Sequence, residues 1–334
     1  MSQSAKRVVL ASRPVGEPKA SDFRVEECAI PAAGAGEVLL RTIWLSLDPY
    51  MRGRMSDGPS YAQPVPVGGV MEAGTVSEVI ASNNTDFAKG DIVLSRAGWQ
   101  THALSDGKGL NRIDPKLGSI SAALGVLGMP GMTAYTGLLD IGKPQPGETV
   151  VVAAASGAVG SAVGQIAKIK GARAIGIAGG KDKCHWLTSE LGFDAAVDYK
   201  DGATFKALRS AAPKGIDVYF DNVGGEILEA CIALMNNRGR IACCGAISQY
   251  DGAPSANGPR GVPGLIVVKR LIMQGFIVMD YMKERDRALA DLQSWVASGK
   301  LKVQEDVIDG IENTPKALIG LLAGENRGKR MVKV

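Results

Sequence analysis

The chain has 334 residues, of which 46% are hydrophobic and 22% are charged, as is usual for a globular protein. This length is roughly twice that of an average domain, so we expect two domains with a substantial core. The formal net charge is only +4, and lysine and arginine form no long runs. Composition and charge therefore argue against nucleic acid as a partner.

The chain carries no signature of export, of a membrane span or of a metal centre. Its first residues lack the apolar core of a signal peptide, and no apolar stretch of about 18 residues follows. The two histidines, His102 and His185, lie outside any metal-ligand cluster, so we expect no bound metal. The cysteines lack CxxC spacing, which suits reduced thiols in the cytoplasm; they are Cys28, Cys184, Cys231, Cys243 and Cys244. We expect a cytoplasmic protein that does not enter membranes.

The first part of the chain, residues 1–124, has the composition and sequence pattern of a mostly-β domain. It is rich in glycine, proline and short β-like runs. Residues 38–47 are predicted to form a strand, and the Gly-rich stretch 67–74 is predicted to form tight turns between strands of a small barrel.

From Gly125 the pattern changes to alternating strands and helices. Residues 149–155 form a continuous apolar run, which is typical of a buried parallel strand. Further strands are predicted at 172–178, 195–198, 217–221 and 240–245, and helices at 158–170, 181–190, 203–212 and 225–236. Such alternation requires crossover connections. It therefore predicts an α/β domain over 125–299 that contains a doubly wound parallel sheet.

The remaining segments are less regular. Residues 251–264 are predicted to form a long Gly/Pro loop. A strand at 271–278 and a helix at 283–298 follow, and 300–334 returns to β-like texture and, we expect, to the first domain.

A glycine-rich turn follows the strand at 149–155 and opens the next helix. Gly157 would let the backbone approach a diphosphate, and Gly160 would let helix and strand pack closely. The first glycine of the GxGxxG pattern is replaced by Ala155, so an ordinary glycine turn is the rival interpretation. The position of the turn in a βαβ series favours dinucleotide binding.

The end of the next strand indicates which dinucleotide binds. An NAD site usually places a carboxylate there, whereas this strand ends in Ala178, Gly179 and Gly180. Lys181 and Lys183 follow and would neutralise a 2′-phosphate, so NADPH is the predicted cofactor. The alternative is that both lysines are only the solvated first turn of a helix.

Seven segments, taken together and in this order, resemble one known family. They are WLSLDPYMRGRMSD (44–57), GVLGMPGMTAYTGL (125–138), AASGAVGS (154–161), YFDNVGGE (219–226), CGAISQY (244–250), QGFIVMDY (274–281) and GENRGKRMVKV (324–334). The chain resembles the zinc-independent medium-chain dehydrogenases/reductases, the group of leukotriene B4 12-hydroxydehydrogenase (prostaglandin reductase), alkenal double-bond reductases and bacterial curcumin reductase. The segments 47–50 and 68–72 stand where zinc-binding relatives carry ligands, and both ligand positions are lost.

The resemblance implies a GroES-like catalytic domain, a Rossmann NADP-binding domain and a homodimer, for which the strand at 271–278 is the expected point of contact. It implies that Lys183 and Tyr199 contact the 2′-phosphate of NADPH. The other residues predicted to line the cofactor are Thr133, Gly157, Ala158, Val159, Gly179, Asn222, Cys244, Gly245, Ala246, Ile247, Tyr250, Phe276, Ile277, Val278 and Asn326. Cys243 and Cys244 are expected to be inert packing in a buried strand.

Hydride transfer from NADPH to the β carbon of an α,β-unsaturated ketone or aldehyde is the predicted reaction. The resulting enolate needs a hydrogen-bond donor, for which Tyr250 is the first candidate and Tyr50 the second. Either tyrosine could instead be a wall of the cleft, and cofactor ribose or water could deliver the proton. Arg52 and Arg54 could attract a substrate carboxylate, or they could be surface charges or domain-interface pairs.

Three other functions remain open at this stage. A zinc-independent quinone reductase and a secondary-alcohol dehydrogenase are enzymatic alternatives, although without zinc nothing evident would acidify an alcohol. A non-catalytic NADPH-binding or RNA-associated protein is the third, and no basic stripe supports it.

Overall fold

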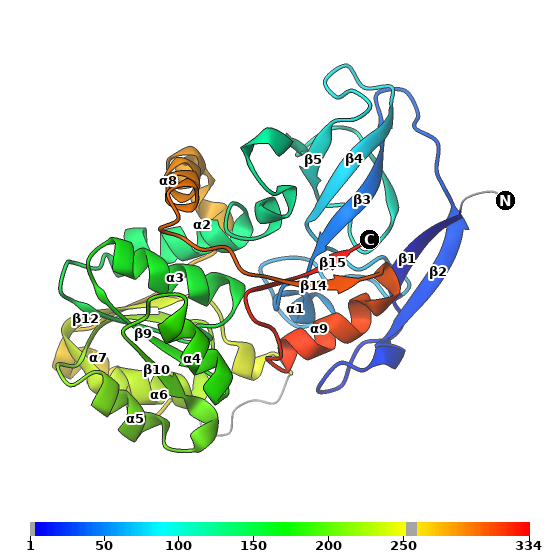
Figure 1. Ribbon diagram of the computed structural model, residues 1–334. Coiled ribbons are helices and arrows are strands. Elements are labelled where there is room, and N and C mark those ends of the chain that lie inside the picture. The colour runs from blue at the N-terminus through cyan, green and yellow to red at the C-terminus, as the bar shows by residue number, and fades with distance from the viewer. Residues whose placement is uncertain (1–3, 252–258) are drawn as a thin grey trace. The chain divides into compact units, whose positions relative to one another are not determined.

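The computed structural model describes residues 4–251 and 259–334, which form two compact units (Figure 1). The first unit contains the chain up to Leu124 and again Glu305–Val334. The second contains Gly125–Gln304. The chain therefore leaves the first unit, builds the second and returns.

The second unit is built on a parallel sheet. Its strands stand in the order β10-β9-β8-β11-β12-β13, and every neighbouring pair is parallel. The bounds are β8 Thr149–Val152, β9 Arg173–Ala178, β10 Ala195–Asp198, β11 Ile216–Asp221, β12 Met235–Cys243 and β13 Ile272–Gly275. In sequence order this is 3-2-1-4-5-6, which confirms the predicted doubly wound sheet and places its topological switch point between β8 and β11.

Helices cover both faces of this sheet. Alternation along the strands sends Val150 and Val152 to one face and Val151 to the other. The first face packs against α2 (Met129–Tyr135), α3 (Ala158–Ile169), α4 (Lys181–Ser189) and α8 (Arg285–Ala297). The second face packs against α5 (Thr204–Ala211), α6 (Gly225–Leu234) and α7 (Val262–Lys269).

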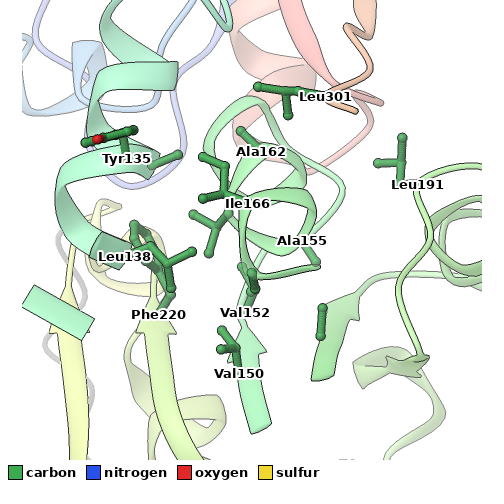
Figure 2. Packing of buried hydrophobic residues seen from close by; sticks show 14 of the residues in the cluster. Tyr135, Leu138, Val150, Val152, Ala155, Ala162, Ile166, Leu191, Phe220 and Leu301 are labelled. Carbon is green, nitrogen blue, oxygen red and sulfur yellow. The ribbon is translucent and has the colours of Figure 1, made fainter. Parts of the chain in front are cut away.

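Figure 2 shows the first of these two cores. Ile166 and Ala162 of α3 lie over Val150 and Val152 of β8, and Leu138 lies near Phe220 of β11. Leu138 belongs to a π-helical segment, Thr136–Gly142, that continues α2. Because this core is almost fully shielded from water, it provides a rigid base for the loops at the strand ends.

Three boundaries in the second unit differ from prediction. The strand β8 ends at Val152 and not at 155, because Ala154 turns into the left-handed region at φ 48°. The helix α6 gives way to β12 at Met235, earlier than predicted, with a β-bulge in the pairing of β12 with β11. The helix α7 begins inside the region predicted as loop and continues through residues 265–269, for which no element was predicted. Residues 252–258 of the predicted loop lie outside the described residues.

The first unit is dominated by antiparallel strands. Its main sheet runs β14-β15-β3-β4-β5-β7, with β6 also paired to β3, and β1 pairs with β2 separately. The bounds are β1 Ser4–Leu10, β2 Phe23–Ala29, β3 Val38–Ser46, β4 Thr75–Ser82, β5 Ile92–Ser95, β6 His102–Ser105, β7 Asn111–Arg112, β14 Glu305–Asp309 and β15 Lys329–Lys333. The predicted strand at 38–47 is confirmed.

The two short α-helices of this unit close one core. α1 (Met51–Arg54) and α9 (Thr314–Leu322) bury Met51 and Leu318 beside Leu45 and Val332. The predicted β-like texture of 300–334 was incomplete, because α9 begins at a proline-containing first turn inside it. Short 3-10 segments lie at Ala20–Asp22, Pro115–Leu117, Ile120–Leu124, Tyr199–Asp201, Ile247–Gln249, Val278–Glu284 and Ile311–Asn313. Among the helices of the described residues, none is both long and apolar enough to cross a bilayer.

Candidate nucleotide-binding and catalytic site

The glycine-rich turn lies at the carboxyl end of β8, beside the switch point of the sheet. Gly157 is the N-cap residue of α3, and Ala158 and Val159 form its first turn. A side chain at Gly160 would place a Cβ 2.8 Å from the Cα of Ala155 and in collision with the carbonyl oxygen of Ala154. The close packing predicted for Gly160 is therefore confirmed, and the first amides of a 12-residue helix lie over the turn.

β9 ends at Ala178 and is followed by Gly179 and Gly180, so no carboxylate stands at the end of this strand. The structure places Tyr199, from the end of β10, directly against Gly179: a Cβ there would lie 3.0 Å from the tyrosine hydroxyl. Lys183 is half-buried in the first turn of α4. Gly179, Lys183 and Tyr199 thus follow two neighbouring strands at the same edge of the sheet, where an adenosine ribose is held in this type of fold.

Asp221, the last residue of β11, organises the loops of this edge. Its Oδ1 accepts hydrogen bonds from the Tyr219 hydroxyl (2.8 Å) and from the amides of Val223 (3.0 Å) and Gly224 (2.8 Å). The carboxylate is only 2% exposed, and burial raises its pKa despite these donors. Gly224 can fold back to the carboxylate because glycine tolerates its φ of 72°.

The loop after β12 is tied to the same residues. The amides of Cys244 and Gly245 donate to the carbonyl of Asp221 (2.8 and 3.1 Å), and the amide of Ile247 donates to the carbonyl of Asn222 (3.3 Å). The Asn222 side chain donates in turn to the carbonyl of Ala153 (2.8 Å). Three loops, after β8, β11 and β12, are thereby joined through two adjacent residues.

Tyr250 stands at the end of this loop. It is half-buried, and its hydroxyl lies 3.2 Å from the position a Cβ would take on Gly245. Ala246 precedes the 3-10 segment that leads to Tyr250. Burial raises the pKa of the neighbouring Cys243 and Cys244 thiols to about 12, so both stay protonated near neutral pH. These thiols are suited to packing and not to redox chemistry.

Two further predicted cofactor residues come from other parts of the second unit: Thr133 lies in α2, and Phe276 directly follows β13. The Phe276 ring packs edge-on against Phe220, with 6.2 Å between centroids, and both rings fill the space beside Gly137. Thr133 is buried in α2, and its hydroxyl donates to the carbonyl of Met129 (2.8 Å). Ile277 and Val278 continue from Phe276 and are half-buried.

The other candidate tyrosine, Tyr50, belongs to the first unit. It precedes α1, in the turn that begins with Asp48. Asp48 is buried and its Oδ1 pairs with the Lys329 ammonium at 2.7 Å, while its Oδ2 accepts from the Ser46 hydroxyl. Burial, and then the Asp48 charge, raises the pKa of Tyr50 well above its usual value. Tyr50 is therefore held as a neutral hydroxyl, which is the form that can donate.

Arg52 and Arg54 are not surface charges, contrary to one of the sequence-based alternatives. They are 2% and 4% exposed. The guanidinium of Arg54 pairs with Glu72 at 2.6 Å and stacks 4.6 Å from the ring centre of Tyr61. Arg52 donates to the Ser56 hydroxyl and to the carbonyl of Gly16, both at 2.8 Å.

Asn326, the last predicted cofactor residue, is also buried in the first unit. Its side-chain amide donates to the carbonyl of Gly328 at 2.8 Å. In the part of the chain that the structure describes, no three His, Cys, Asp or Glu side chains gather where they could hold a metal ion. Glu72, in the Gly-rich segment 67–74, is paired with Arg54.

A parallel sheet in this order, with a glycine-rich turn at its switch point, defines a dinucleotide-binding domain. Comparison with known proteins agrees. A family model described as the N-terminal domain of oxidoreductase matches residues 6–113, and one described as zinc-binding dehydrogenase matches 158–294.

Relatives match from end to end. The NADPH-dependent curcumin reductase of Escherichia coli is 48% identical over 99% of this chain and 97% of its own length. The NADP(+)-dependent 2-alkenal reductase of Nicotiana tabacum is 40% identical over 99% and 98%. The crystal structure of CurA from Vibrio vulnificus in complex with NADPH covers 98% of this chain and 99% of its own, with 48% identity and a TM-score of 0.95. The chain belongs to the medium-chain dehydrogenase/reductase family, in the group of the curcumin and alkenal double-bond reductases.

Sequence reasoning missed three functional features of the structure. Asp221 joins the loops at this edge, and the signal that could have found it is an acidic residue at the end of a buried strand, three residues before Gly224. The pairing of Asp48 with Lys329 joins two of the recognised motifs, but a separation of 281 residues gives no local signal. Lys200 lies beside Tyr199 over Gly179, and nothing in the periodicity distinguished it from a surface lysine.

Proposed function

We propose that this protein is an NADPH-dependent reductase of the C=C bond of α,β-unsaturated ketones and aldehydes. The observation that carries the proposal is end-to-end similarity to relatives named as NADPH-dependent curcumin reductase and NADP(+)-dependent 2-alkenal reductase. A 2-alkenal has a C=C bond conjugated to an aldehyde. The two relatives therefore support a substrate in which a carbonyl activates the double bond.

The second unit is proposed to hold the cofactor. Gly160 has no room for a side chain, because a Cβ there would collide with the backbone of Ala154 and Ala155. This close packing of α3 on the turn supports a diphosphate held at the amides of the helix N-terminus. In this assignment Gly157, Ala158 and Val159 face the diphosphate, while Lys183 and Tyr199 face the 2′-phosphate. The loop residues Asn222 and 244–247, with 276–278, line the nicotinamide half, and Thr133 and Asn326 complete the set. The absence of a carboxylate at the end of β9 supports NADPH over NADH.

The first unit is proposed to be the catalytic domain. NADPH, when bound, supplies the hydride that the β carbon of the substrate accepts. Charge then develops on the carbonyl oxygen, and a tyrosine hydroxyl would stabilise it by donating a hydrogen bond from Oη. Tyr250, which follows β12 in the second unit, is the first candidate for this donor, and Tyr50, in the first unit, is the second. The raised pKa of Tyr50 supports a neutral donor there.

A substrate panel tests the proposal. NADPH oxidation is followed at fixed enzyme concentration with enones, 2-alkenals, quinones and, in the reverse direction, secondary alcohols with NADP⁺. We expect turnover with enones and alkenals and a saturated carbonyl product by mass spectrometry. Activity confined to quinones or to alcohols would favour those reductase or dehydrogenase alternatives. Tight NADPH binding without any turnover would favour a non-catalytic binding protein.

We also propose a homodimer formed through β13. This strand is the outermost of the sheet in the described chain, and its Ile272 is 58% exposed. Val267 and Val268 of the adjoining α7 are 74% and 68% exposed, which is unusual for neighbouring apolar side chains. Light scattering should give twice the mass of 34.8 kDa, and Ile272→Lys should shift it toward the monomer.

A cytoplasmic location is proposed as well. Every cysteine of the chain is a free thiol in the structure, which suits a reducing compartment. Fractionation of cells that express the tagged protein would test this, and recovery from a membrane or secreted fraction would contradict it.

A further inference from the structure

The turns that follow β9 and β10 are held together by one carboxylate. Asp198 ends β10 and pairs in register with Ala178 of β9. Its Oδ1 accepts hydrogen bonds from the amide of Gly180 (2.8 Å) and from the amide of Lys200 (3.0 Å). The backbone of Lys200 is therefore fixed beside the end of β9 and does not depend on a flexible loop.

The side chain of Lys200 lies over Gly179. A Cβ on Gly179 would be 2.9 Å from the Lys200 Cε and 3.0 Å from the Tyr199 hydroxyl. The last carbon before the ammonium and the phenol oxygen thus converge on the same glycine. Gly179 stands where NAD-binding domains usually carry a carboxylate. A side chain there would displace both groups, and a carboxylate would neutralise the lysine.

Among the residues that the structure describes, the Lys200 ammonium has no carboxylate partner. Within residues 4–251 and 259–334, no carboxylate oxygen lies within 4 Å of its ammonium, unlike Lys168, which pairs with Asp194 at 2.8 Å. The nearest anchor, Asp198, directs Oδ1 to two backbone amides. An ammonium that is placed by its backbone but has no anionic partner is suited to an anion from outside the chain.

We infer that Lys200 is a binding group for the 2′-phosphate of the adenosine ribose, in addition to Lys183 and Tyr199, and that it contributes to the preference for NADPH over NADH. This assignment rests on the proposed function. It follows from the convergence of Lys200 and Tyr199 on a glycine at the end of β9, a placement that the family resemblance did not supply. The ligand chemistry is a phosphate monoester on a ribose, so the free fragment 2′,5′-ADP should show the same dependence.

The test is calorimetric titration of the wild-type protein, Lys200→Met and Lys206→Met with NADPH, NADH, 2′,5′-ADP and 5′-AMP. Lys206 is an exposed lysine of α5, so Lys206→Met removes the same charge a short distance along the chain. Loss of one charge-assisted contact should weaken NADPH and 2′,5′-ADP about tenfold in Lys200→Met. The affinities of this variant for NADH and 5′-AMP should stay within about twofold of those of the wild type. In Lys206→Met the affinities for all four ligands should stay within about twofold.

The outcomes separate this assignment from the proposed function. A wild-type protein that binds NADPH no better than NADH overturns the proposed cofactor, and the role of Lys200 with it. If the wild type prefers NADPH and Lys200→Met keeps the same preference, only the role of Lys200 is overturned. Equal weakening of NADPH and NADH in Lys200→Met would also overturn it, because that result means a distorted turn and not a lost phosphate contact.

Discussion

The carboxyl edge of the parallel sheet and the turn after β3 hold their candidate functional groups by different means. At the sheet edge, the Asp221 carboxylate accepts from neutral donors, namely one phenol and two amides. In the turn, the Asp48 carboxylate meets a second buried charge, the ammonium of Lys329. Loss of a single neutral donor lowers the free energy of unfolding only modestly. Removal of one member of a buried ion pair lowers it more, because the other member is left as an uncompensated buried charge. The turn after β3 should therefore be the less tolerant region.

The largest effect is expected from Lys329→Met. The variant leaves Asp48 buried without its counter-ion, which should lower the free energy of unfolding by about 3–5 kcal/mol. Urea denaturation followed by circular dichroism measures this. Lys333→Met, on the same strand but at an exposed lysine, is the matched control and should change stability by less than about 1 kcal/mol. The double variant Asp48→Asn with Lys329→Met should recover part of the lost free energy of unfolding. Equal stability of the Lys329 and Lys333 variants would contradict the idea that the turn after β3 is the less tolerant region.

The next effect separates the two regions by catalysis. Tyr250→Phe removes the hydroxyl of the first candidate donor and keeps an aromatic ring, and it should lower kcat with an enone about 100-fold. Tyr50→Phe tests the donor of the other region in the same assay, and Tyr61→Phe, at a ring 63% exposed, is the control. A large loss of kcat in Tyr50→Phe alone would identify Tyr50, in the first unit, as the donor. Full activity in both variants would mean that water or the cofactor ribose delivers the proton.

The third prediction concerns the glycine-rich turn. Gly160→Ala forces a Cβ against the backbone of Ala154 and Ala155, which should cost about 1–3 kcal/mol and abolish measurable NADPH binding. Thermal unfolding with and without NADPH measures both effects. Gly264→Ala, within α7 and with no atom within 4 Å of the new Cβ, should be at least as stable as the wild type. Retained NADPH binding in Gly160→Ala would contradict the role given to the turn.

The smallest effect is a pH dependence at the sheet edge. Burial raises the folded-state pKa of Asp221 above its unfolded value near 4. The folded state therefore binds the proton more tightly, and the stability from this group, present below about pH 4, is lost as pH rises through the folded pKa. Asp221→Asn cannot titrate, so its free energy of unfolding relative to wild type should rise over that interval and then level off. A constant difference from pH 4 to 8 would contradict the assignment.

The sequence predicted the fold well where the local pattern and the tertiary structure agree. The strand β10 lies at the predicted residues, because a short apolar run is flanked by polar residues on both sides. The helix α7 was missed, because the Gly/Pro content before it suggested a loop, and its side chains are only partly buried. The helix α9 was missed for a related reason: its apolar side is set by packing against strands far away in the sequence.

The candidate site was predictable only in part. Gly157 and Gly160 follow from the chemistry of a diphosphate turn, and the structure shows why Gly160 tolerates no side chain. Thr133 and Asn326 came from the resemblance alone, since neither position has a local pattern that distinguishes it. Lys200 and Lys329 depend on which strands become neighbours, which is a property of the topology and not of spacing.

The long separation between Asp48 and Lys329 has a consequence for biosynthesis. The strand β15 pairs with β3, and the backbone of Val334 donates to Ile43, so the first unit needs residues made some 280 positions later. On a ribosome, the whole parallel sheet emerges before the ammonium that neutralises Asp48. Until the C-terminal residues are made, β3 lacks its partner strand β15 and Asp48 lacks its counter-ion. The nucleotide-binding unit can therefore fold before the first unit is complete.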